Sequence, residues 1–179
     1  MHTAELKHWK TYDRQTIRNI AEVVKAAVRP EMRIMIGTDA QRIGRDVHFV
    51  TVLILYDPGH GGRVFFTREK ILKKMSLWEK LSTETWKSLE AAMMVEEILG
   101  SKAQIEVHID STDNPKYRSS DYVKQLVGMV VGSGFRSVIK PDAAASSHCA
   151  DHCVKFLNVP RSQRPSSVSR KKKSAGRKR

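Results

Sequence analysis

The stretch of sequence that decides the fold is Arg33-Ile34-Met35-Ile36-Gly37-Thr38-Asp39-Ala40-Gln41. It has the length of a strand, and β-branched Ile34 and Ile36 occupy alternate positions, which favours a buried strand. Gly37 has no Cβ, so another backbone or a ligand can approach it closely. Asp39 stands where the apolar run ends, and a carboxylate there is costly to bury without a partner. We therefore expect Asp39 to bind either a structural partner or a metal ion.

The composition is that of one soluble globular domain. The chain has 179 residues, of which 40% are hydrophobic and 28% charged, enough for a sizeable core. No apolar run reaches the length of a membrane span, and the first residues lack the apolar segment of a secretory signal. Cys149 and Cys153 do not make a disulfide framework. These features predict a cytoplasmic protein without a membrane partner and leave the oligomeric state open.

The net charge of +13 is concentrated near the C-terminus. Nine of the 32 basic residues and none of the 19 acids follow Pro160, which leaves 23 basic and 19 acidic residues, a net of +4, in the rest of the chain. The composition of residues 159–179 predicts a disordered basic tail. Such a tail binds nucleic-acid phosphates without sequence preference, although a solubility segment and a localisation signal are the alternatives. The basic residues expected to contact phosphates are Arg170, Lys171, Lys172, Lys173, Arg177, Lys178 and Arg179.

The order of predicted elements indicates an α/β fold. We expect a helix over 13–28, strands over 33–39, 47–56 and 63–68, a helix over 76–99, a strand over 104–110, a helix over 120–131, a strand over 137–140 and a helix over 146–157. Short turns join the first three strands, whereas the later strands alternate with helices. This pattern predicts a mixed five-stranded sheet, with three antiparallel meander strands followed by two crossover strands, and helices on both faces. The domain is expected to span 32–158, with the N-terminal helix of 1–31 packing on its core.

Carboxylates recur at matching places in this pattern. Asp39 and Asp110 each end an apolar strand, and Glu84 is the only acid inside the apolar stripe of the long helix, where a hydrogen-bonded core residue is the alternative. Asp151 borders the stripe of the last helix, and Asp142, after the fifth strand, is its substitute. Acids gathered at one end of a sheet repel one another unless a cation lies between them. Their oxygens suit two Mg²⁺ or Mn²⁺ ions, which can support phosphodiester hydrolysis.

Short segments around these acids resemble a known family. The segments are Ile36-Gly37-Thr38-Asp39-Ala40-Gln41, Leu81-Ser82-Thr83-Glu84-Thr85, His108-Ile109-Asp110, and Ile139-Lys140-Pro141-Asp142 leading into Ala145-Ser146-Ser147. Together, within residues 32–156, they resemble the ribonuclease H-like superfamily and, within it, the YkuK family, a domain-of-unknown-function family. The resemblance implies a metal-dependent nuclease or polynucleotidyl transferase. Its first three acids map onto Asp39, Glu84 and Asp110, and the fourth onto Asp151 or Asp142. Ala40 departs from the Ser expected there, which affects a hydrogen bond near the site.

The sequence thus predicts a nuclease that hydrolyses phosphodiesters of RNA, DNA or an RNA/DNA hybrid with two Mg²⁺ or Mn²⁺ ions. Asp39 would bridge both ions, Glu84 and Asp110 would hold one, and Asp151 or Asp142 would hold the other. The alternatives are a non-catalytic nucleic-acid-binding module of the same fold and a junction resolvase-type nuclease.

The segment from His148 to Cys153 has two further interpretations. His148 and His152 are four residues apart on the expected helix and are candidate proton shuttles beside the metal ions. With Cys149 and Cys153 they could instead form a zinc site. The His pair and the Cys pair point about 100° apart on a helix, whereas a structural zinc ion needs four converging ligands. The proton-shuttle interpretation is therefore favoured.

Overall fold

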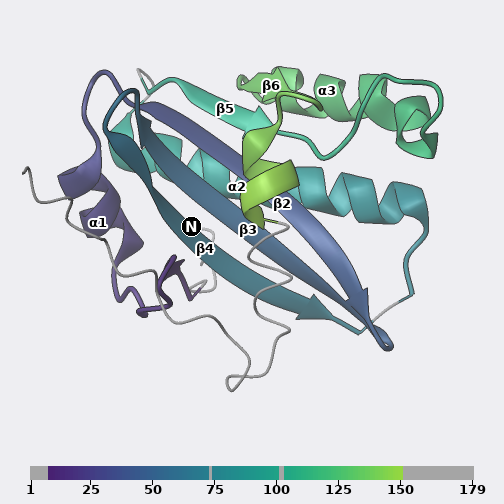
Figure 1. The fold of residues 1–179 in the computed structure, drawn as a ribbon, viewed down its shortest axis with the longest axis horizontal. Helices are drawn as coiled ribbons and strands as arrows, with labels where there is room; N and C mark the ends of the chain where they lie inside the picture. Colours follow the sequence, from purple (N-terminus) through teal and green to yellow (C-terminus); the bar gives the residue numbers. More distant parts are fainter. Residues whose placement is uncertain (1–7, 73, 101–102, 151–179) are drawn as a thin grey trace, which may run out of the picture.

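One mixed sheet of six strands organises the fold of the computed structural model, which describes residues 8–72, 74–100 and 103–150 (Figure 1). The strand order is β1-β4-β3-β2-β5-β6. The strands are β1 (Lys10–Thr11), β2 (Arg33–Ile43), β3 (Asp46–Asp57), β4 (Gly61–Ile71), β5 (Ile105–His108) and β6 (Arg136–Val138). The helices are α1 (Ile20–Ala27), α2 (Leu77–Leu99) and α3 (Val123–Gly132), with a 3₁₀ turn η1 (Arg118–Tyr122) and a π-helical turn η2 (Ala145–Ala150).

The predicted arrangement of strands is confirmed, but the predicted count of five is wrong. β2, β3 and β4 form an antiparallel meander, and β5 and β6 run parallel to β2. The β2–β3 turn contains Gly44 at φ +62°, a conformation that side chains disfavour. The sixth strand is β1, whose Lys10 and Thr11 pair with Phe66 and Phe65 of β4. Two residues are too few to show an alternating pattern in the sequence, so β1 is a strand only because it pairs with the edge of β4.

The first helix is shorter than predicted. It begins at Ile20 after Asn19, whose side-chain oxygen accepts hydrogen bonds from two backbone N–H groups of the first turn. Asp13, where the predicted helix begins, instead accepts a hydrogen bond from the Thr11 hydroxyl in a turn where Arg14 has a φ of +72°. An Asp side chain readily accepts hydrogen bonds from nearby donors, and here Asp13 does so within the turn after β1 rather than at the start of a helix.

The long helix α2 matches the prediction closely. Ser76 caps it and forms a capping box with Glu79, and it ends before Gly100 at φ +85°. Its apolar side packs with α1 and α3 on one face of the sheet, against a core that includes Ile34, Ile36 and Leu53. In the described ranges, η2 is the helical element on the opposite face, where it covers the cluster of Met35, Val50, Val52, Ile54 and Phe66 (Figure 1). Helices on both faces are therefore confirmed.

Strand β2 does not end at Asp39 as predicted. It continues to Ile43, and Asp39 pairs with Val50 of β3, because the hairpin ladder with β3 extends to its turn. The parallel ladder with β5 is shorter and stops at the pair of Gly37 and His108. Asp39 therefore lies beyond the end of β5 rather than at the end of its own strand.

The later elements show smaller differences. Ser120 lies inside η1, and α3 begins at Val123. Of the helix predicted over 146–157, the structure describes the residues up to 150, which form the π-helical turn η2. The predicted basic tail and the residues from 151 onward lie outside the described residues. Within the described ranges, α2 and the other helices are too short or too polar to cross a membrane.

Candidate active site

Two predicted acids lie where β5 ends beside β2. Asp39 is two residues beyond Gly37 on β2, and Asp110 is two residues beyond His108, the last residue of β5. Both carboxylates are largely covered. The Ile109 N–H donates to the Val138 carbonyl (2.8 Å), so the chain after β6 continues to run beside Asp110. Both acids therefore lie just beyond the point where the parallel ladder of β2 and β5 ends.

Glu84 reaches the same place from α2. It is 3% exposed, which confirms the prediction that it faces the core. One turn later on α2, the Ser88 hydroxyl donates to Thr38 Oγ1 (2.8 Å), which is also hydrogen-bonded to Thr51 Oγ1 (2.9 Å). This buried chain of hydroxyl groups ties α2 to β2 and β3 next to Asp39. Strand alternation directs Asp39 to the sheet face opposite Thr38, so Glu84 and Asp39 belong to different faces of the sheet.

The electrostatics of Glu84 are unusual for a core residue. Burial raises its pKa to about 8, against the attraction of Lys80, and the nearby carboxylates of Asp39 and Asp110 add to the rise. Glu84 Oε2 has no hydrogen-bond partner within the described part of the chain. Lys80 Nζ lies 2.9 Å from Glu84 Oε1 and 3.8 Å from Asp39 Oδ1. The three acids therefore influence one another, and one lysine lies among them.

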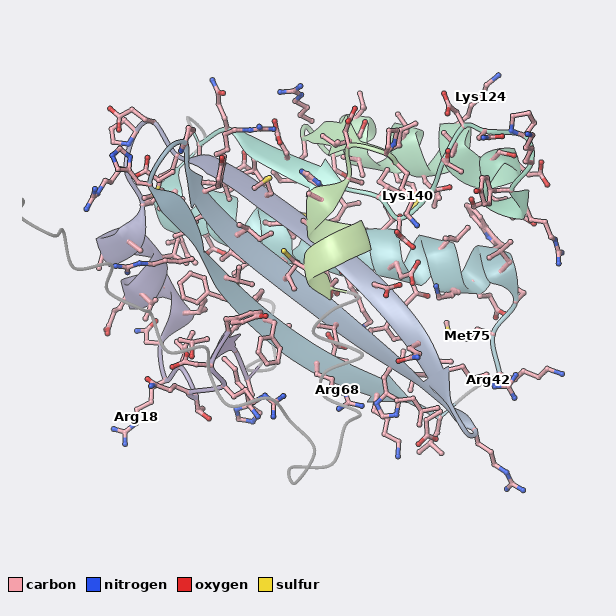
Figure 2. All side chains as sticks on the ribbon, viewed as in Figure 1. Arg18, Arg42, Arg68, Met75, Lys124 and Lys140 are labelled. Carbon is pink, nitrogen blue, oxygen red and sulfur yellow. The ribbon has the colours of Figure 1, made fainter. Side chains whose placement is uncertain are left out.

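Both lysines near the acids form ion pairs with them. Burial lowers the pKa of Lys80, but Glu84, Asp39 and Asp110 together outweigh it, so the net shift is upward and Lys80 stays charged. Lys140 Nζ lies 2.7 Å from Asp110 Oδ1, and its side chain is 40% exposed. Figure 2 shows Lys140 in the middle of the view, whereas the labelled Arg18, Arg42 and Lys124 lie at its periphery. Lys80 and Lys140 thus supply the positive charge that the acids need in this structure.

The donor chemistry of the acids fits a hard divalent cation, because all their ligand atoms are carboxylate oxygens. The unpartnered Glu84 Oε2 is also the kind of buried atom that a metal ion would satisfy. Within residues 8–72, 74–100 and 103–150, however, no group of three or more His, Cys, Asp or Glu side chains is arranged closely enough to hold a metal ion. Metal binding at Asp39, Glu84 and Asp110 would therefore require the ammonium group of Lys80 to move aside.

The predicted fourth acid is only partly described. Asp142 is exposed in the turn between β6 and η2, and its N–H donates to the Ile139 carbonyl (3.0 Å). Asp151 and His152 lie outside the described residues, as do the side chain of His148 and all of Cys153, so the fourth-acid, proton-shuttle and zinc interpretations stay predictions. Cys149 packs against the apolar cluster under η2, and burial raises the pKa of its thiol.

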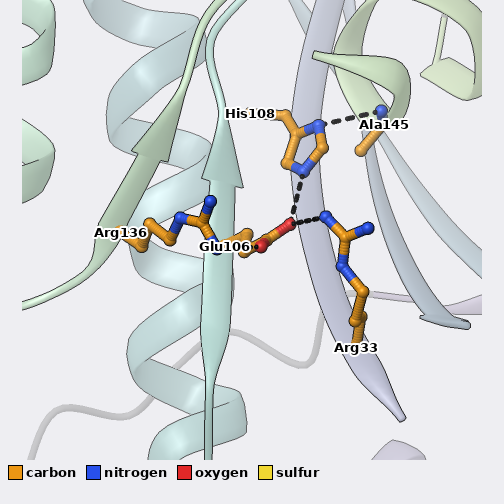
Figure 3. Close-up of polar contacts among 5 residues, drawn as sticks. All are labelled: Arg33, Glu106, His108, Arg136 and Ala145. Carbon is orange, nitrogen blue, oxygen red and sulfur yellow. Dashed lines mark hydrogen bonds and ion pairs between the residues drawn. The ribbon is translucent and has the colours of Figure 1, made fainter. Parts of the chain in front are cut away.

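Two residues of β5 form a buried polar cluster that sequence reasoning missed. Glu106 is 5% exposed and His108 is 2% exposed. Arg33 and Arg136 donate to the Glu106 carboxylate, as Figure 3 shows. Burial alone would raise the pKa of Glu106, but Arg33, His108 and Arg136 together lower it. Alternation of polar and apolar residues over 105–109 is typical of a strand exposed on one face, so it gives no signal for this burial.

A family model and several solved structures are similar to this chain. A family model described as Ribonuclease H-like matches residues 15–155. Among solved structures, the chain is similar to RNase H1 from the halophilic archaeon Halobacterium salinarum NRC-1, with 19% identity and a TM-score of 0.36, over 69% of this chain and 98% of that chain. It is also similar to the N-terminal RNase H domain of Rv2228c from Mycobacterium tuberculosis, solved as a fusion with maltose-binding protein, with 14% identity and a TM-score of 0.38, over 70% of this chain and 99% of that chain. No curated protein sequence matches. Because the family match spans most of its length, the chain belongs to the Ribonuclease H-like family.

Proposed function

We propose that this protein is a metal-dependent nuclease that hydrolyses phosphodiesters of RNA, DNA or an RNA/DNA hybrid, and that within its family it belongs to the YkuK group. The observation that carries the proposal is Glu84, whose buried Oε2 has no partner in the described ranges although Asp39 and Asp110 lie nearby. A buried polar atom without a hydrogen bond lowers the stability of the fold. Perturbed carboxylates that converge in this way are typical of functional sites.

The acids would share two Mg²⁺ or Mn²⁺ ions. Asp39, Glu84 and Asp110, together with Asp142 or Asp151, would hold them. Bound there, such ions supply an activated water and stabilise negative charge on the leaving oxygen. The hydroxyl groups of Ser88, Thr38 and Thr51 attach α2, the helix that carries Glu84, to β2 and β3.

Lys140 is suited to contact the substrate. Its ammonium group now pairs with Asp110, yet its side chain is 40% exposed. An exposed lysine loses little by changing partner, because surface ion pairs contribute little stability. When a cation binds Asp110, Lys140 would be released to contact a phosphate of the nucleic acid.

A non-catalytic nucleic-acid-binding module is the second candidate. The ion pairs of Lys80 with Glu84 and of Lys140 with Asp110 favour it, because they neutralise the acids without a metal ion. In such a module the acids would be structural, and nucleic acid would bind without being cut.

A cleavage screen separates these functions. Single-stranded, duplex, hybrid and branched substrates would be incubated with Mg²⁺, Mn²⁺ or EDTA, using the wild type and the Asp39→Asn variant. Asp57→Asn is the matched control, because Asp57 lies at the far end of β3 and pairs with His60. The nuclease proposal expects cleavage that needs metal and Asp39 but not the Asp57 carboxylate. Binding without cleavage in either metal would instead establish the module, and a preference for branched DNA would indicate a junction resolvase.

A further inference from the structure

The polar cluster around Glu106 lies on the face of the sheet opposite α2. In the register with β2, Glu106 is beside Met35 and His108 is beside Gly37, and Met35 belongs to the apolar cluster that η2 covers. Arg33 Nη2 donates to Glu106 Oε2 (2.8 Å), and Arg136 Nη1 donates to Glu106 Oε1 (2.9 Å) (Figure 3). The two arginines keep this buried carboxylate ionised, and they attach it to β2 and β6.

His108 continues this chain of contacts to η2. The backbone N–H of Ala145 donates to His108 Nδ1 (3.3 Å). A ring nitrogen that accepts a hydrogen bond carries no proton, so the proton of the neutral ring is on Nε2. Nε2 lies 3.4 Å from Glu106 Oε2 and donates to it. Burial, the largest influence on His108, lowers its pKa, which agrees with a neutral ring. Ala145 therefore donates to His108, and His108 and the two arginines donate to Glu106, so one connected set of hydrogen bonds links β2, β5 and β6 to the first residue of η2.

The hydrogen bond from Ala145 matters because the described side chains of η2, those of Ala145, Cys149 and Ala150, are small and apolar. Ala145 and Ala150 are fully buried, and with Cys149 they lie on the apolar surface of β2, β3 and β4. Methyl groups on such a surface have little directional preference, since apolar contacts depend on area rather than angle. A hydrogen bond is directional, and the bond from Ala145 to His108 attaches the first residue of η2 to β5.

The same contact joins the two parts of the candidate active site. His108 is two residues before Asp110, and Ala145 is three residues after Asp142. We infer that Glu106 and His108 are positioning residues of this site. They set the place of the segment that carries Asp142 relative to Asp110 at the end of β5. This inference rests on the proposed function, because it assigns these acids to metal binding.

Two substitutions of His108 test the inference. In His108→Asn the amide oxygen can take the place of Nδ1 and accept from Ala145, whereas in His108→Gln the amide replaces Nε2 and the bond to Ala145 is lost. We expect His108→Gln to lower kcat or Mn²⁺ affinity about tenfold or more, and His108→Asn to stay within about threefold of the wild type. KM for the nucleic acid should be unchanged in both. The control is His60→Asn, in the exposed turn between β3 and β4.

Amide hydrogen exchange of Ala145, measured by NMR in EDTA, tests the positioning without requiring activity. Exchange should be faster in His108→Gln than in the wild type, and close to the wild type in His108→Asn. Should His108→Gln not fold, Glu106→Gln weakens the same chain and should also speed exchange of Ala145. If the wild type neither binds Mn²⁺ nor cleaves, the proposed function fails, and the exchange rates still decide whether His108 positions η2. Equal activities of the Asn and Gln variants, or unchanged exchange in the folded Gln variant, would overturn the inference.

Discussion

Glu84→Gln should make the metal-free protein less sensitive to alkaline pH. The substitution keeps the shape of the side chain and removes its ability to ionise. In the wild type the pKa of Glu84 rises from the ordinary value of 4.5 to about 8 because the carboxyl is buried. Between these two values the folded protein holds a proton that the unfolded chain releases. The stability contributed by this proton is complete below pH 4.5 and is lost as the pH rises towards 8.

The size of the effect follows from this window. Each pH unit inside it costs about 1.4 kcal/mol, so at pH 7 the wild type has lost about 3 kcal/mol of its free energy of unfolding through Glu84. The variant does not lose this energy, but it weakens the contact with Lys80, whose Nζ lies 2.9 Å from Glu84 Oε1. The gain at pH 7 should therefore be about 1–3 kcal/mol and should vanish near pH 5.

Urea unfolding in EDTA at pH 5, 6, 7 and 8 measures this difference. The matched control is Glu97→Gln, an exposed position on the same helix. The wild type and the control should lose stability with rising pH more steeply than Glu84→Gln. Added Mn²⁺ should stabilise the wild type and have a smaller effect on Glu84→Gln, because a bound ligand stabilises only the state that binds it. Parallel pH profiles for all three proteins would refute this account of Glu84.

Four further predictions concern the site and the tail. Asp39→Asn should remain folded and lose Mn²⁺ binding in calorimetry; unchanged binding would exclude Asp39 as a ligand. Lys80→Met should bind Mn²⁺ several-fold more tightly, because the ammonium group beside Glu84 no longer competes with the ion; weaker binding would mean that Lys80 helps to assemble the site. Thr38→Val should lower the free energy of unfolding by about 1–3 kcal/mol, because it removes the shared partner of Ser88 and Thr51; an unchanged urea midpoint would contradict this. Deleting residues 161–179 should flatten the dependence of nucleic-acid affinity on salt, because nine positive charges are removed; equal slopes would show that the tail does not contact the substrate.

Local patterns in the sequence were sufficient to predict the meander, the long helix and the buried position of Glu84. The strands within 33–71 contain continuous β-branched and aromatic runs separated by glycine turns, and these preferences act over a few residues. Ser76 with Glu79 and the terminal Gly100 mark the ends of α2 in the same local way. Because a helix has a fixed period, the apolar stripe of α2 also determines that Glu84 faces inward.

Tertiary structure decided the features that depend on partners distant in sequence. β2 continues past Asp39 because β3 pairs with it, and Lys10–Thr11 is a strand because it lies against the edge of β4. Glu106 is buried beside Arg33 and Arg136, which are 73 and 30 positions away along the chain. The pKa of Glu84 likewise depends on burial and on the distances to Lys80, Asp39 and Asp110. Electrostatic energies vary with separation and burial, and only the folded chain sets either of them.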